Sequence, residues 1–200
     1  MAFFKGFLTG LGTIIFIGPV LFTLLKASLQ YGRKAGLAVA IGIIISDIAA
    51  VAICLAGSTL LHAHPEYRLY IGLLAAAMLL VMGIKYLVQP GTSLFELINI
   101  TSTHTTIFLI KGFLVNFVNP FVFVVWLGII AYGSQQYGMG NTLLLYLAGC
   151  LAGIFFLDAT RALLAEQITR FLTPKHLSHV YRAIGVLLIF FGIRILWVVL

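Results

Sequence analysis

The stretch FIGPVLFTLL at residues 16–25 places a Gly-Pro pair inside an otherwise apolar run. A proline inside a helix removes a hydrogen bond and clashes with the preceding turn, which costs about 3 kcal/mol. In hydrocarbon the cost is greater, because no water is present to satisfy the freed carbonyl group. We therefore expect a broken helix here, with its interruption facing protein or a water-filled cavity.

The composition of the chain is that of an integral membrane protein. Of its 200 residues, 62% are hydrophobic and 8% are charged, and the mean hydropathy is +1.15. Soluble domains carry about 25% charged residues. The net charge of +7 comes from basic residues that stand between apolar runs. We expect this charge to set the orientation in the membrane, and we expect no binding to nucleic acid.

Six apolar stretches are each long enough to cross a bilayer, which takes about 20 residues. They cover residues 4–29, 36–61, 66–88, 107–132, 141–165 and 181–200. The predicted fold is an all-α membrane protein with six transmembrane helices. Because the number of crossings is even, both termini are expected on the same side of the membrane.

The basic residues are distributed unevenly between the two sides of the membrane. Three of them, Lys5, Arg68 and Arg194, lie toward the side of the termini. The other nine lie near the first, third and fifth connectors: Lys26, Arg33, Lys34, Lys85, Lys111, Arg161, Arg170, Lys175 and Arg182. Cytoplasmic loops carry the excess of lysine and arginine, so both termini are predicted to lie outside the cytoplasm.

Three short motifs occur twice along the chain, in the same order in each half. They are KGFL at 5–8 and 111–114, Gly42-x-x-x-x-Asp47 and Gly153-x-x-x-x-Asp158, and LLVMGIKYL at 79–87 and LIFFGIRIL at 188–196. The repetition predicts one membrane domain made of a three-helix repeat at 1–88, a connector at 89–106 and a second three-helix repeat at 107–200. Because each repeat crosses the membrane three times, the two must run in opposite senses. This is an inverted 3+3 repeat, an arrangement found in many secondary transporters.

Helices one and four are both expected to be broken, at corresponding positions of the repeat. Gly18-Pro19 interrupts the first, and Asn119-Pro120, preceded by Asn116, interrupts the second. Paired interruptions of this kind are a sequence pointer to a binding site near the midplane. The half-helix that starts at each proline presents free N–H groups and a positive dipole end, which suit a carboxylate. These five residues are our predicted substrate-binding residues.

Asp47 and Asp158 are the acidic residues expected deep within spans. An intramembrane carboxylate is costly, usually faces the bundle interior and often binds a proton or a cation. We therefore predict that both aspartates couple transport to an ion, H⁺ or Na⁺. A structural alternative is open for Asp158, because Arg161 lies one helical turn away and can pair with it.

The ordered motifs resemble those of the LysE/RhtB family of bacterial amino-acid exporters. The residues that carry the resemblance are Ile17-Gly18-Pro19, the spaced Gly32, Gly36 and Gly42 followed by Asp47, and Asn116-Phe117-Val118-Asn119-Pro120. Ile17 stands where the family often has the first proline of a Pro-Gly-Pro motif, and Phe121 stands where the family often has a lysine directly after Asn-Pro. The resemblance implies a multi-pass exporter of amino acids or similar small metabolites in the bacterial inner membrane.

The mechanism we expect is secondary transport by alternating access, without enzymatic activity, a metal or another cofactor. No Walker loop is present in the sequence, so ATP is not expected to drive transport directly. The expected partners are an amino acid, the coupling ion, the lipid bilayer and a second copy of the chain in a homodimer.

Other functions are compatible with the same residues. The scaffold could carry an ion, a metal or electrons, although Cys54 and Cys150 do not occupy corresponding positions of the repeat. A membrane-embedded enzyme would require Asp47 and Asp158 to act as an aspartyl dyad. A non-transporting assembly subunit would show no flux by itself.

Overall fold

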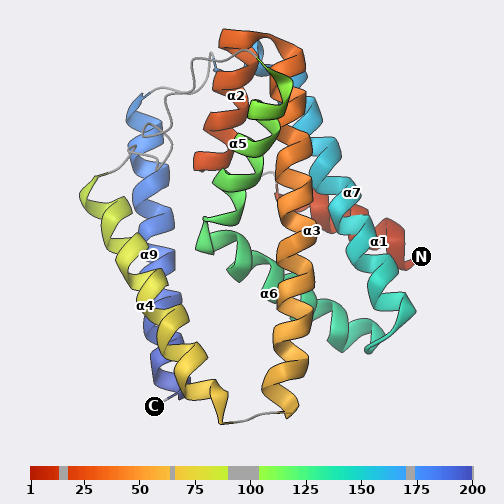
Figure 1. Cartoon of the computed structure of the whole chain (residues 1–200), viewed down its shortest axis with the longest axis vertical. Coiled ribbons are helices and arrows are strands. Elements are labelled where there is room, and N and C mark those ends of the chain that lie inside the picture. Colours follow the sequence, from red (N-terminus) through yellow and green to blue (C-terminus); the bar gives the residue numbers. More distant parts are fainter. Residues whose placement is uncertain (14–17, 64–65, 90–103, 170–173, 200) are drawn as a thin grey trace.

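The structure is a computed structural model that describes residues 1–13, 18–63, 66–89, 104–169 and 174–199. The described part of the chain is helical throughout (Figure 1). Its helices are α1 (Ala2–Gly12), α2 (Pro19–Tyr31), α3 (Arg33–Ala63), α4 (Tyr67–Val88), α5 (Thr105–Phe117), α6 (Pro120–Tyr137), α7 (Asn141–Leu163), α8 (Ala165–Thr169) and α9 (Pro174–Val199). The all-helical class predicted from the sequence is confirmed.

Four of these helices are long and apolar enough to cross a membrane. The stretches that qualify are Arg33–Gly57, Leu69–Val88, Asn141–Leu163 and Ser178–Val199. They agree closely with the predicted spans at 36–61, 66–88, 141–165 and 181–200. The helices α5 and α6 form a fifth candidate span that is bent by 69° at the break between them.

The predicted first span, residues 4–29, covers most of α1 and α2. Residues 14–17 between them lie outside the described residues, so the count of six spans stays a prediction. Most of the predicted connector at 89–106 also lies outside the described part of the chain.

Both predicted interruptions coincide with helix starts. Pro19 is the first residue of α2 and Pro120 is the first residue of α6. At α6 the side chain of Asn119 caps the helix, because its Oδ1 accepts a hydrogen bond of 3.1 Å from the backbone N–H of Phe121. Proline suits the first helical position because the N–H that it lacks would have no partner in the helix.

Three helix pairs form the main packing contacts: α1 lies along α7, α5 lies along α3, and α4 lies along α9 (Figure 1). Glycines permit the first two pairs to approach closely. A Cβ atom placed on Gly6 would overlap the backbone carbonyl of Tyr146, and one on Gly149 would overlap that of Phe3. These contacts resemble the small-residue interfaces by which membrane helices pack in the absence of a hydrophobic driving force.

The second pair repeats this arrangement with residues of the other half. A Cβ on Gly112 of α5 would overlap the carbonyl oxygen of Val39, and one on Gly42 of α3 would overlap that of Leu109. Gly6 and Gly112 are the glycines of the two KGFL motifs, and Gly42 is the counterpart of Gly153 in the other repeated motif. The KGFL motifs therefore supply equivalent close contacts in both halves, whereas the contact of Gly42 with Leu109 is matched by that of Gly149 with Phe3 and not by Gly153.

Gly149→Ala is expected to destabilise the protein by about 1–3 kcal/mol, because the new methyl group meets backbone atoms that cannot rotate away. Gly128→Ala is the matched control, since a Cβ at Gly128 of α6 meets nothing within 4 Å. Thermal unfolding of the purified proteins in detergent measures the difference. Equal melting temperatures of the two variants would contradict the close packing of α1 on α7.

Candidate functional site

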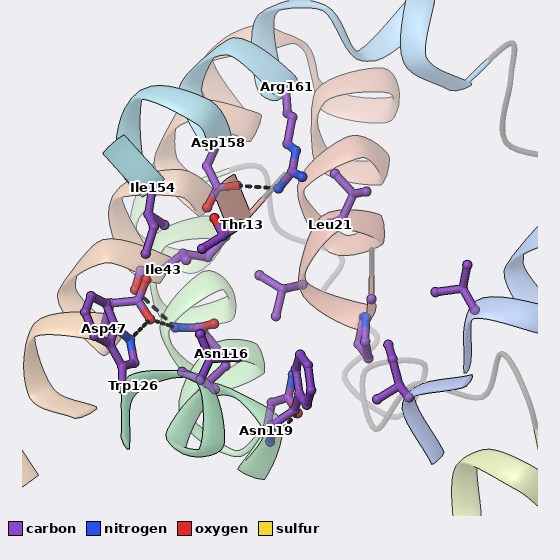
Figure 2. Close-up of a pocket in the computed structure, with 18 of the residues that line it drawn as sticks. Thr13, Leu21, Ile43, Asp47, Asn116, Asn119, Trp126, Ile154, Asp158 and Arg161 are labelled. Carbon is purple, nitrogen blue, oxygen red and sulfur yellow. Dashed lines mark hydrogen bonds and ion pairs between the residues drawn. The ribbon is translucent and has the colours of Figure 1, made fainter. Parts of the chain in front are cut away.

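A cavity of about 370 Å³ lies where the helix starts of α2 and α6 approach α3, α7 and α9 (Figure 2). Most of its lining is apolar, and the polar residues that line it are few: Thr13, Asp47, Asn116, Asn119, Asp158 and Arg161, together with the indole of Trp126. A largely apolar pocket with a small number of placed polar groups is the usual form of a small-molecule site.

The structure brings most of the predicted site residues to this one cavity. Gly18, Pro19, Asn116 and Asn119 line it, although they come from opposite halves of the chain. Pro120 is buried but is not among the lining residues. The two predicted ion-coupling residues, Asp47 and Asp158, also line the cavity.

Asp47 on α3 is the centre of a hydrogen-bond network that joins three helices. Its Oδ1 accepts a bond of 2.8 Å from Nδ2 of Asn116 on α5 and a bond of 3.0 Å from Nε1 of Trp126 on α6. The Asn116 amide also lies 3.2 Å from the hydroxyl oxygen of Ser46 and 3.4 Å from the carbonyl oxygen of Ile43. Figure 2 shows Asp47 held between the two donors.

This network links α3 to both sides of the break between α5 and α6. Asp47 is 4% exposed, Asn116 3% and Trp126 1%. A buried carboxylate costs free energy unless hydrogen bonds stabilise it, and a hydrogen bond to a charged group contributes about 1.5–3 kcal/mol. The network therefore fixes the position of the carboxylate at the edge of the cavity and also the direction in which α6 leaves the break.

Asp158 has a different kind of partner. Its Oδ1 lies 3.1 Å from Nη1 of Arg161, one turn later on the same helix, α7. The ion pair that the spacing allowed is therefore present. Its two ends belong to a single helix, unlike the bonds of Asp47.

Two functional candidates, Trp126 and Arg161, were not predicted from the sequence. The sequence does not distinguish Trp126 from a lipid-facing aromatic residue, because a single tryptophan in an apolar span is common to both cases. Arg161 was considered only as a partner of Asp158, whereas its side chain also lines the cavity. An arginine within an apolar span is itself a signal of an interior or functional position.

The family model described as LysE type translocator matches residues 11–198 of the chain. This match includes every residue that lines the cavity and both helix interruptions, at 18–19 and 119–120. No curated protein and no solved structure matches the chain. The match extends over almost the whole chain, and the helices described above are long and apolar enough for several crossings of a membrane. The chain belongs to the LysE-type translocator family, and it is a multi-pass membrane transporter.

Proposed function

We propose that the protein is a secondary active transporter that exports amino acids or similar small metabolites across the bacterial inner membrane. The observation that carries this proposal is the cavity, where the two predicted helix interruptions, at 18–19 and 119–120, lie beside two intramembrane aspartates. Discontinuous helices around a central site are the usual architecture for substrate and ion binding in secondary transporters.

Alternating access in this proposal comes from rocking of two inverted repeats, 1–88 and 107–200, joined by the connector 89–106. The reciprocal packing of α1 on α7 and of α5 on α3 supports it, because each repeat contributes one partner to each pair. The equivalent glycine contacts of the two KGFL motifs give the same support. Six spans would put both termini on the same side of the membrane, and the distribution of basic residues favours the side outside the cytoplasm; a homodimer is the assembly that we expect.

The substrate lies between the two helix starts in this proposal, in contact with Gly18, Pro19, Asn116 and Asn119, while Pro120 shapes the second break. Asp47 is the main ion-coupling residue, and Asp158 is the second. Oδ1 of Asp47 accepts both of its hydrogen bonds, and Oδ2 has no hydrogen-bond partner among the described residues. A proton or Na⁺ can therefore reach Asp47 without breaking its bonds to Asn116 and Trp126.

Counterflow in proteoliposomes tests transport without assuming a driving ion. Vesicles are loaded with one unlabelled amino acid at a time, and uptake of the labelled amino acid reports exchange. Lysine, arginine, threonine, homoserine, leucine and cysteine cover the charge and size classes. Exchange of at least one of them, reduced in Pro19→Ala or Asn119→Ala, is the expected result. Absence of exchange with the whole panel, in protein shown to be folded, would contradict amino-acid transport.

Asp47→Asn is expected to uncouple transport while the protein stays folded. The amide keeps an oxygen that can accept the hydrogen bonds of Asn116 and Trp126, but it cannot bind a proton or Na⁺ as a carboxylate does. Substrate flux driven by an imposed H⁺ or Na⁺ gradient should therefore be lost. Glu166→Gln is the matched control, because Glu166 is exposed on α8 and does not line the cavity. Unchanged gradient-driven flux in Asp47→Asn would exclude the coupling role.

Trp126→Phe is expected to slow exchange about tenfold, because it removes one of the two donors to Asp47 and keeps an aromatic ring in the core. Trp197→Phe is the matched control, since Trp197 is 82% exposed. Initial exchange rates of both variants and of the wild type give the comparison. Equal rates in all three proteins would show that the indole N–H is not needed to position Asp47.

A further inference from the structure

The ion pair between Asp158 and Arg161 is placed at the wall of the cavity, where a ligand can reach both charges. Both residues line the cavity, and their side chains are 9% and 12% exposed. Arg161 is also the one basic residue among the described residues that line it. A carboxylate that enters this cavity therefore meets a full positive charge at Arg161.

The pair differs from the Asp47 network in what it holds together. Asp47 joins α3 to α5 and α6, so its hydrogen bonds maintain the contacts between helices. Asp158 and Arg161 stand three residues apart on α7, so opening their bond separates no helices. Figure 2 shows the pair on one side of the cavity, apart from Asp47 and its two donors.

The helix starts are weaker candidates for binding a carboxylate. At α6 the N–H of Phe121 already donates to the side chain of Asn119. At α2 the N-cap residue, Gly18, has no side chain to cap the helix, and a helix start carries only about half an elementary charge. The guanidinium of Arg161 carries a full charge and presents several donors, which match a carboxylate in geometry as well.

Charge balance restricts which ligand can open the pair. A ligand that binds only Arg161 takes the ion-pair partner away from Asp158 and leaves a buried charge uncompensated. Breaking a buried pair by removing one partner is strongly destabilising. A zwitterion with its two charges close together replaces both partners at once. The α-ammonium and α-carboxylate groups of a free amino acid have this arrangement.

We propose that Asp158 and Arg161 form the recognition site for the backbone of a free amino acid, with Arg161 binding the α-carboxylate and Asp158 binding the α-ammonium group. In the empty transporter the two residues pair with each other, and the substrate inserts between them. The inference rests on the proposed transport function. It makes both residues determinants of specificity, replaces the coupling role of Asp158 with substrate binding, and leaves Asp47 as the ion-coupling residue.

The other residues that line the cavity indicate which class of side chain the substrate carries. Leu21, Ile43, Val125, Ile154 and Ile184 are among the residues that line it. Among the described residues of the lining, the one further charged residue, Asp47, is assigned to the coupling ion in the proposed function, and burial of each CH₂ group against the apolar residues contributes about 0.8 kcal/mol. The substrate class is therefore an α-amino acid with an uncharged apolar side chain, for which leucine serves as the probe.

Isothermal titration calorimetry of the purified protein in detergent tests this assignment with three probes of the same shape. Leucine carries both charges, leucinamide lacks the carboxylate, and 4-methylpentanoate lacks the ammonium group. The wild type is expected to bind leucine at least tenfold more tightly than either analogue. Arg182→Gln, an exposed residue of α9 that does not line the cavity, is the matched control and should bind leucine like the wild type.

The two variants are expected to change specificity in opposite directions. Arg161→Gln should weaken leucine binding at least tenfold and make leucinamide the better ligand, because Asp158 then lacks a cation. Asp158→Asn should make 4-methylpentanoate the better ligand, because the ammonium group of leucine then has no carboxylate to bind, whereas Arg161 can still bind a carboxylate. If Arg161→Gln does not fold, Asp158→Asn still carries the test, since the assignment requires this inversion by itself.

A pair with a merely structural role would give a different pattern. Both variants would then bind all three probes in the same order as the wild type, and this result overturns the assignment. Failure of the wild type to bind leucine also overturns it. If leucine does not bind but counterflow of another metabolite is observed, the proposed transport function is retained and only the binding assignment is wrong. Absence of counterflow with every amino acid of the panel contradicts both the transport function and the binding assignment.

Discussion

The absence of water in the membrane interior is the constraint on which the rest of this structure depends. Backbone and side-chain groups freed by a broken helix must find partners within the protein. At the second break, Asn119 caps α6 through its side chain, and Asp47 receives hydrogen bonds from Asn116 before the break and from Trp126 after it. One carboxylate, two amide side chains and one indole thus stabilise a 69° bend that the hydrocarbon would otherwise make costly.

Close contacts between helices place this network beside the other broken segment. Gly6 and Gly149 bring α1 against α7, while Gly42 and Gly112 bring α3 against α5. Because these contacts are between backbone atoms, they leave no freedom for larger side chains at the crossing points. The starts of α2 and α6 then both lie at the cavity, which Pro19 and Asn119 line although they are far apart in the sequence.

Much of this arrangement could be predicted from the sequence, because its causes are local. A proline in an apolar run predicts a break, repeated motifs predict equivalent packing, and a lone intramembrane aspartate predicts an interior position, as found for Pro19, the KGFL glycines and Asp47. Other features depend on the fold. The donor role of Trp126 and the access of Arg161 to the cavity require contacts that no spacing reveals. The direction of α6 depends on where Asp47 lies in space.

Alternating access of a single cavity is the central claim of this account, and site-directed labelling tests it most directly. Ala183 of α9 lines the cavity, so Ala183→Cys in a background with Cys54→Ser and Cys150→Ser places one thiol there. A membrane-impermeant maleimide is then applied from one side of oriented vesicles and from the other. The predicted result is that the introduced thiol is labelled from both sides and that the ratio of the two labelling rates changes when substrate is added. Labelling from the same side only, with and without substrate, would contradict the account.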